Sequence, residues 1–342
     1  MKLAKNFLTV TVVLTFLVAL AHCDAADPVL PGIELVRPPL RIRVIDNSAR
    51  YFHLNDTVVT GMNGLASLIH DDQNKNILGY CGMNLEETKT NPQAGVLREL
   101  WNAPRVAPMK IERVDPCSVK LTQTAAEAAG LNHEIIFTLG DSYIDQTITT
   151  WPDQNIESSH TFYATYMNQP QNTSLFLHGT LQGSAAAEWL ELTSPGHGGD
   201  GVVFFRPFEP KGKAWHEFLT DNPVVRQGRF RSPQTIAAAE KASFKAGELK
   251  SFDSFMFGFF DEYVLLFIFR PQSDTRFGMW ISSSGALAVR CPAWDYSIDS
   301  GPQKGGERRT FHVRLVYKPF KGIDDILAEV KRFSAETAGE SQ

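Results

Sequence analysis

The sequence contains few cysteines, four in 342 residues. Beyond residue 25 only Cys81, Cys117 and Cys291 remain, and none has the CxxC or Cys/His spacing of a structural zinc site. We therefore expect neither a metal nor a cofactor. A disulfide between Cys81 and Cys117, the nearer pair in the sequence, would leave one thiol unpaired, and three separate buried thiols are the alternative.

Long apolar runs and clusters of basic residues are also scarce. The chain holds 33 Lys and Arg against 38 Asp and Glu, a net charge of −5, with no Lys/Arg run that would indicate nucleic-acid binding. No stretch after residue 25 is long and apolar enough to span a bilayer. The composition therefore predicts no nucleic-acid partner and no integral membrane segment in the mature chain.

Residues 1–25 have the pattern of a cleaved signal peptide. A basic start is followed by the apolar run Phe7–Ala21, which is too short to span a membrane comfortably, and Cys23-Asp24-Ala25 fits the small-x-small cleavage rule. We therefore expect a secreted or periplasmic protein. A lipoprotein anchored through Cys23 is the alternative, which His22 disfavours because a small residue should precede that cysteine.

The stretch Phe252–Pro271 indicates the fold class. Two runs of aromatic and aliphatic residues meet at Asp261-Glu262, which predicts a β-hairpin buried on both faces. Strands covered on both faces need a layer of structure on each side. Leu40–Ile45 alternates apolar with basic residues, as a strand with one wet face does. We expect a mostly β protein, an antiparallel two-sheet sandwich forming a single domain over residues 40–342 after a Pro-rich tether at 26–39.

Helical patterns are few. Residues Ala94–Trp101 and Ala185–Leu192 predict short helices, and Thr235–Leu249 predicts another that begins just after Ser232-Pro233. The tail Gly322–Ala335 is amphipathic, and one of its faces carries Ile323, Ile326, Leu327, Val330 and Phe333. We expect this C-terminal helix to pack on the outer surface of the sandwich.

Three motifs resemble known functional loops but lack the partners that such loops need. Gly140-Asp141-Ser142 resembles the nucleophile block of a hydrolase family, yet no histidine has Asp three positions before it, so we interpret the motif as a turn. His197–Gly201 resembles an esterase oxyanion loop without a GxSxG elbow, which favours an ordinary flexible loop. Asp71–Asn76 resembles a calcium loop, but Ile77 and Met83 stand where Gly and Glu are required.

The stretch Thr60–Leu78 is similar to the opening of galactose-mutarotase-like proteins. An Asn63-Gly64 turn leads into a strand, a polar loop and an Asn-Ile-Leu step. Gly61–Ile69 and Phe162–Leu177 also resemble uncharacterised secreted bacterial proteins of this type, which supplies no reaction. The resemblance implies two large antiparallel sheets packed face to face, a supersandwich. It also implies acid/base chemistry on a sugar by a histidine and a carboxylate, without a redox cofactor.

Two regions, 151–168 and 270–296, combine the aromatic, amide and charged side chains that bind sugars. On a strand, Arg276 and Trp280 share a face, and Gly278 between them leaves room for a ligand. The alternative is that the aromatic side chains of both regions pack in the core. From the two regions we predict catalytic roles for His160, Tyr166 and Asp295, and substrate contacts for Trp151, Tyr163, Asn168, Arg276, Trp280 and Trp294.

The sequence thus favours an exported protein that binds carbohydrate or acts on it. A non-catalytic binding or structural module of the envelope is one alternative, because no complete catalytic constellation is recognisable. A polysaccharide lyase or hydrolase is another, with Tyr or His as the base and Arg neutralising a uronate.

Overall fold

The computed structural model describes residues 32–48, 50–52, 58–90, 103–125, 130–168, 170, 174–193, 203–207, 245–247, 249–282 and 292–338. The signal peptide at 1–25, the helix expected at Ala94–Trp101 and the loop at His197–Gly201 lie outside these residues, as does most of the helix expected at Thr235–Leu249. Among the described helices, none combines the length and the apolar character needed to cross a membrane.

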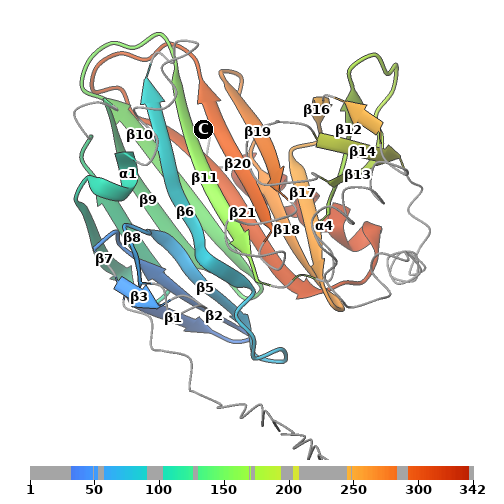
Figure 1. Cartoon of the computed structure of the whole chain (residues 1–342), viewed down its shortest axis with the longest axis horizontal. Helices are drawn as coiled ribbons and strands as arrows, with labels where there is room; N and C mark the ends of the chain where they lie inside the picture. Colours follow the sequence, from blue (N-terminus) through green and yellow to red (C-terminus); the bar gives the residue numbers. More distant parts are fainter. Residues whose placement is uncertain are drawn as a thin grey trace, which may run out of the picture.

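Two large sheets face each other and form the body of the molecule (Figure 1). The first has seven strands in the order β1-β2-β5-β6-β11-β20-β19. Its strands are β1 (Ile33–Arg37), β2 (Leu40–Ile45), β5 (Gly64–His70), β6 (Leu78–Thr90), β11 (Ser159–Met167), β20 (Ala293–Ser300) and β19 (Thr275–Ser282). A separate pair, β3 (Arg50–Phe52) and β4 (Val58–Thr60), and the single helical turn α1 (Ala103–Val106) lie to one side.

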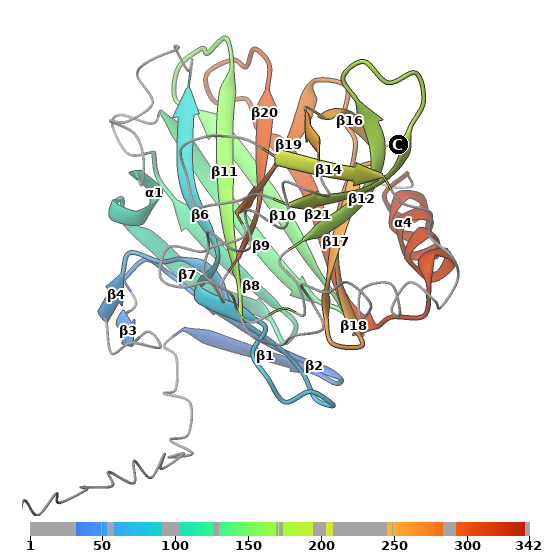
Figure 2. The same cartoon turned by 45° about the vertical axis from the view of Figure 1, so that its right-hand side comes forward.

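The second sheet has twelve strands and supplies the opposite layer, as the turned view shows (Figure 2). Its order is β15-β14-β13-β12-β17-β18-β21-β10-β9-β8-β7, with β16 paired to β12. The strands are β7 (Met109–Asp115), β8 (Ser118–Gln123), β9 (Leu131–Leu139), β10 (Tyr143–Pro152), β12 (Leu175–Leu181), β13 (Glu188–Thr193), β14 (Val203–Pro207), β15 (Lys245–Gly247), β16 (Leu249–Phe252), β17 (Phe255–Phe260), β18 (Tyr263–Phe269) and β21 (Arg309–Pro319). Neighbouring strands are antiparallel in both sheets, so the predicted supersandwich is confirmed.

The β17–β18 hairpin lies in the middle of the twelve-stranded sheet and is buried on both faces, which confirms the hairpin predicted at Phe252–Pro271. Asp261 turns the chain with a positive φ of 53°. Because successive side chains of a strand point to opposite faces, the hairpin supplies two apolar clusters. The inner cluster lies between the sheets and includes Met256, Phe260, Leu265, Phe267 and Phe269. The outer cluster includes Phe255, Phe257, Phe259, Val264, Leu266 and Ile268.

Helix α4 (Ile323–Ala338) covers the outer cluster, on the side of the sheet that faces away from its partner (Figure 2). Ile326 and Phe333 are buried in the contact, and Ile323 and Val330 pack against it. Leu327 instead is 42% exposed, so the apolar stripe is narrower than the sequence suggests. The amphipathic C-terminal helix and its place on the outer surface are thus confirmed.

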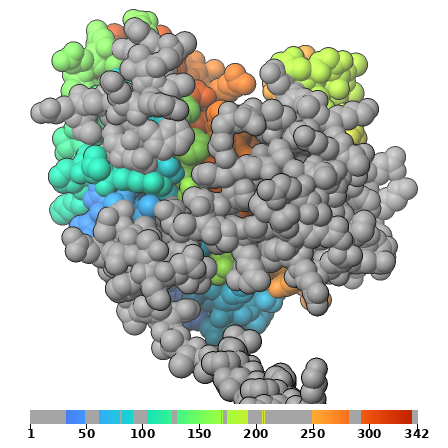
Figure 3. Space-filling view, viewed as in Figure 1, coloured from blue at the N-terminus to red at the C-terminus, as the bar shows by residue number. Residues whose placement is uncertain are grey.

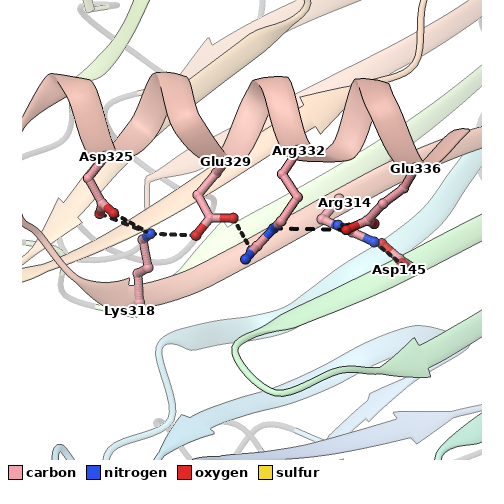
Figure 4. Close-up of polar contacts among 7 residues, drawn as sticks. All are labelled: Asp145, Arg314, Lys318, Asp325, Glu329, Arg332 and Glu336. Atoms are coloured by element: carbon pink, nitrogen blue, oxygen red, sulfur yellow. Dashed lines mark hydrogen bonds and ion pairs between the residues drawn. The ribbon is translucent and has the colours of Figure 1, made fainter. Parts of the chain in front are cut away.

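A line of ion pairs joins α4 to the strand beneath it (Figure 4). It runs through Lys318 of β21 and through Asp325, Glu329, Arg332 and Glu336 of α4. Arg314 of β21 closes it, because its Nε and Nη2 atoms donate to Asp145 at 2.6 and 2.7 Å while Nη1 lies 2.7 Å from Glu336. The guanidinium also stacks 3.8 Å above the ring of Tyr143. Charge pairing therefore reinforces the apolar contact between helix and sheet.

The helix predicted at Ala185–Leu192 is wrong. Residues Glu188–Thr193 form strand β13, which pairs with β12 and β14. Leu190 and Leu192 enter the core from alternate positions, which is the period of a strand. The local Ala and Leu content favours a helix, but pairing with two neighbouring strands outweighs that weak preference.

Other segments also differ from expectation. Within the predicted tether, Ile33–Arg37 forms β1 and pairs with β2, and the last residues expected in the helix at Thr235–Leu249 instead belong to β15 and β16. Cys117 carries a free, partly exposed thiol, so the Cys81–Cys117 disulfide is not formed. Gly140-Asp141-Ser142 connects β9 to β10, which confirms its interpretation as a turn.

Gly258 of β17 provides the room for an indole ring from the facing sheet. A Cβ atom at Gly258 would overlap the six-membered ring of Trp294, which is fully buried. We expect Gly258→Ala to destabilise the fold by about 1–3 kcal/mol, the range for an overpacked core. Urea unfolding measures this loss. Gly301→Ala is the matched control, because a Cβ atom there has no heavy atom within 4 Å; equal losses in the two variants would contradict the packing.

Arg314 tests the attachment of α4. Its side chain is only 4% exposed, whereas Asp145 and Glu336 are partly exposed. Arg314→Ala therefore leaves two carboxylates without their cation, but water can partly solvate them. We expect a loss of about 2 kcal/mol in the free energy of unfolding, below the ~3–5 kcal/mol of fully buried pairs. Arg332→Ala, at a half-exposed position of the same line, should cost less than ~1 kcal/mol. Comparable losses at both positions in thermal or urea unfolding would count against this account.

Candidate functional site

The outer face of the seven-stranded sheet, turned away from the other sheet, gathers charged and aromatic side chains. Directly paired residues of an antiparallel sheet project on the same face. The registers of β6, β11, β20 and β19 place Lys89, His160, Asp299 and Arg276 in one line across four strands, which we call the charged row. Figure 3 shows this side of the molecule, with green and orange surface of β11, β19 and β20 visible in its upper half.

His160 and Asp299 form a close pair within the charged row. A hydrogen bond of 2.6 Å joins His160 Nδ1 to Asp299 Oδ1, and the two side chains are 19% and 44% exposed. A carboxylate bound at Nδ1 fixes the tautomer of the imidazole and leaves Nε2 available to a ligand. The ring of Phe162 stacks beside that of His160, with centroids 6.4 Å apart. This arrangement is suited to proton transfer.

Lys89 and Glu87 of β6 form an ion pair at the end of the charged row. Both side chains are almost completely buried, and burial lowers the pKa of Lys89. Charges held away from water are costly, so an ion pair on the outer face of a sheet, outside the apolar core, is unusual. Ionisable groups with perturbed pKa values gather at functional sites, which favours this face as a site.

Asp295 and Glu86 lie further along the same face. Arg105 of α1 lies 2.8 Å from Glu86 and donates to Asn84 Oδ1 at 3.2 Å. Asp295 Oδ1 accepts a 2.7 Å hydrogen bond from the backbone N–H of Thr165. Burial raises the pKa of Asp295 well above its ordinary value, and the charge of Glu86 adds to the rise. A carboxyl group of this kind keeps its proton to higher pH, as a general acid must.

A β-bulge brings the two glutamates to the same face. Phe162 pairs with Glu87 whereas the next residue, Tyr163, pairs with Leu85, so Glu86 is the extra residue. Both carboxylates consequently reach cations of the outer face. The bulge is a local device that doubles the negative charge beside β11.

Edge strand β19 gives the face an exposed aromatic and cationic margin. Trp280 is 49% exposed, and its ring contacts that of Phe162 edge-on, with centroids 6.3 Å apart. Gly278 separates Trp280 from Arg276 on the same face, but the room for a ligand predicted above it is wrong, because the hydroxyl of Ser297 from β20 would overlap a Cβ atom on Gly278. An exposed ring beside a guanidinium can pack on the C–H face of a sugar and bind its polar groups.

Five of the nine predicted site residues lie on this outer face. They are His160, Tyr166, Asp295, Arg276 and Trp280. Tyr166 is 7% exposed and packs in a small apolar cluster with Met62 and Ala164. Of the other four residues, Arg276 and Trp280 are exposed, whereas His160 and Asp295 are only partly exposed.

The remaining four predicted residues lie elsewhere. Tyr163 and Trp294 project between the sheets and are fully buried. Trp151 lies on the outer face of the twelve-stranded sheet beneath the guanidinium of Arg308. Asn168 follows β11 and donates to a backbone carbonyl of the β5–β6 turn at 2.9 Å. We leave these four residues out of the candidate site.

Sequence reasoning missed five charged members of the face, which are Glu86, Glu87, Lys89, Arg105 and Asp299. The polar segment of β6 lacks the strict alternation that marks a strand, because the bulge at Glu86 interrupts it. A charged run next to the apolar start of β6 was the one available indication.

The described residues contain no cluster of three or more metal-ligating side chains. The Asp71–Asn76 loop is the turn between β5 and β6, and Arg41 reaches into its oxygens. Arg41 donates to Asn74 Oδ1 at 2.9 Å and lies 3.4 Å from Asp71. The guanidinium of Arg41 is therefore the cation that these loop oxygens contact.

No protein-family model matches the sequence, and neither does any curated protein. A solved structure from Escherichia coli K12, named as an aldose 1-epimerase, matches with 8% identity and a TM-score of 0.51, covering 85% of this chain and 100% of its own. The chain has the galactose-mutarotase-like fold. A galactose mutarotase-like protein from Lactobacillus casei also matches this fold (9% identity, TM-score 0.48, 84% of this chain and 100% of its own). So does heparan sulfate lyase HepC from Pedobacter heparinus (8% identity, TM-score 0.39, 87% of this chain and 38% of its own).

Asp295→Asn tests the protonation state on this face of the galactose-mutarotase-like fold. Folding raises the pKa of the Asp295 carboxyl. Its contribution to the free energy of unfolding is therefore fully present below the ordinary pKa and is lost as the pH rises through the raised pKa. Wild-type stability should therefore fall as the pH rises above the ordinary carboxyl pKa of 3.8, and the stability of the Asn variant should fall less. The Asn side chain keeps an oxygen for the Thr165 N–H. Urea unfolding across this range, with the exposed Asp324→Asn as control, measures the difference; identical slopes in Asp295→Asn and the wild type would contradict it.

Proposed function

We propose that the protein binds carbohydrate on the outer face of the seven-stranded sheet and that His160 performs acid/base chemistry there. The charged row carries this proposal, because it brings His160, Asp299 and Arg276 together from three different strands. Trp280 and Phe162 supply an adjoining aromatic surface. A structure with the same fold and the name of an aldose 1-epimerase adds support.

His160 Nε2 exchanges a proton with the sugar in this proposal. Asp299 is a positioning residue that holds the imidazole through Nδ1 and stabilises the imidazolium. Asp295 lies four residues from Asp299 along β20, roughly 13 Å at the rise of a strand, so it is too far away to act on the same sugar carbon as His160. Removal of the proton from the anomeric hydroxyl by His160, with protonation of the ring oxygen by a water molecule, would break the C1–O5 bond. The reverse transfers then close the ring on either face of the carbonyl.

Arg276 favours a second candidate, a lyase or hydrolase acting on acidic polysaccharide. Its side chain is exposed, and among the residues that the structure describes no carboxylate lies within ion-pair distance of it. A uronate carboxylate would form a charge-assisted pair with this guanidinium. His160 would then be the base that removes a proton from the uronate ring.

A glycan array carrying neutral and uronate-containing glycans, probed with the mature protein, tests both candidates. On any hit, Trp280→Ala should weaken binding about fivefold or more, the effect of a contact worth ~1 kcal/mol, and His160→Ala should slow turnover by at least about a hundredfold. Trp151→Ala and His178→Ala are matched controls, because Trp151 is a partly exposed Trp and His178 pairs with Asp253 at 2.7 Å, both on the other sheet.

The outcomes separate the candidates. Neutral sugar turnover that needs His160 supports the first, and activity confined to uronates supports the second. Binding without turnover, unaffected by His160→Ala, indicates a non-catalytic module. Silence on every glycan, or equal effects of the control variants, would refute the proposed site.

We also propose that the chain is exported through residues 1–25. Fractionation of the producing cells, with N-terminal sequencing of the protein, tests this. A mature end after Ala25 outside the cytoplasm is expected, and an uncleaved chain in the cytoplasm would refute it.

A further inference from the structure

The space between the two sheets is not uniformly apolar. Buried polar side chains project into it from four neighbouring elements, and several of their atoms have no hydrogen-bond partner in the described part of the chain. The atoms are Tyr163 Oη, Gln146 Nε2, His133 Nδ1, Thr150 Oγ1 and Gln303 Oε1. The five side chains that carry them are at most 3% exposed. They fall into two groups.

The first group is centred on Tyr163. Its ring lies parallel to that of Tyr296, with centroids 5.0 Å apart and an interplanar angle of 11°. Tyr296 donates to Gln146 Oε1 at 2.5 Å, which leaves the amide nitrogen of the same side chain unpaired. Tyr163 and Tyr296 are direct cross-strand partners, and the charge of Tyr163 adds to the raised pKa of Tyr296, so the Tyr163 hydroxyl lies near the Tyr296–Gln146 bond. One oxygen acceptor placed there would serve both Tyr163 Oη and Gln146 Nε2.

The second group is centred on His133. Its Nε2 atom is bonded to Thr88 Oγ1 at 3.1 Å, and its Nδ1 atom has no partner within the described ranges. Thr150 is the direct cross-strand neighbour of His133, so the two side chains stand next to each other on the inner face. The amide nitrogen of Gln303 donates to the carbonyl of Thr150 at 3.3 Å and to that of Glu307 at 2.6 Å, so the Gln303 side chain lies at the same end of β10.

Both groups require a small, neutral ligand that donates and accepts hydrogen bonds. Burial holds the pKa of His133 to about 3 and raises that of Tyr163, so imidazole and phenol are both uncharged near neutral pH. An ion would have no countercharge there. Buried polar groups without protein partners are the usual sites of internal water, which makes about three hydrogen bonds.

We propose that ordered water molecules are bound between the sheets at two places, one joining Tyr163 to Gln146 and one joining His133 to Thr150 and Gln303. Water would complete the hydrogen bonding of all five atoms. The second place lies directly behind the candidate site, because Thr88 separates Glu87 from Lys89 on β6 and points inward. The proposal does not depend on the proposed function.

Variants that remove only a hydroxyl show whether that hydroxyl binds water, because the sign of the change in stability differs between the two cases. Removing a buried hydroxyl that has no partner stabilises a protein, whereas removing one that binds water destabilises it. We expect Tyr163→Phe and Thr150→Val each to lower the folding equilibrium constant, measured by urea unfolding, about threefold to tenfold. Tyr296→Phe is the matched control, since it loses a direct bond to Gln146 and must destabilise in either case.

Oxygen-17 relaxation dispersion of the solvent provides the second measurement, because it detects water held inside a protein for long times. The wild type should show a dispersion, and Tyr163→Phe should reduce its amplitude. Each place is judged by its own variant. A higher folding constant for Tyr163→Phe or for Thr150→Val would overturn the water at that place, and a wild type without any dispersion would overturn both.

Discussion

Burial of the β17–β18 hairpin on both faces is the constraint on which the rest of the structure depends. Its inner side chains meet the seven-stranded sheet, and its outer ones need a cover of their own, which α4 supplies. Successive residues of a strand point to opposite faces, so a strand that is apolar throughout needs a cover on both faces at once. Trp294 of β20 packs directly over Gly258 of this hairpin. The seven-stranded sheet is thus held in place by a hairpin in the middle of the twelve-stranded sheet.

The candidate site follows from how the seven-stranded sheet is built. Inward positions of β11 and β20 are filled by Tyr163, Trp294 and Tyr296, which hold the sheet on the core. The residues between them are free to carry polar chemistry on the outer face. His160 and Asp299 take such positions, and the bulge at Glu86 adds a second carboxylate without disturbing the inner pattern. Packing and chemistry therefore occupy alternate residues of the same strands.

The sequence predicted what depends on local pattern. The aromatic runs of Phe252–Pro271 and the stripe of Gly322–Ala335 each contain enough periodicity to reveal a hairpin and an amphipathic helix. The site was only partly predictable, because a face is defined by register between distant strands: His160 and Asp299 are 139 positions apart. Tyr163 and Trp294 are of residue types that bind sugars, but they stand at the alternate strand positions that point inward. At β13, helix-favouring residues were overruled by strand pairing that no local window contains.

The order of elements along the chain has a consequence for synthesis. The ribosome makes β17 and β18 well before α4, so Phe255, Phe257 and Phe259 emerge without the helix that later shields them. Until α4 is made, the nascent chain exposes an apolar surface through which chains can associate. The ion pairs of Lys318 and Arg314 with the helix form last, because they need Glu329 and Glu336 of α4. Exposure of these phenylalanines before α4 forms therefore follows from the order of elements along the chain.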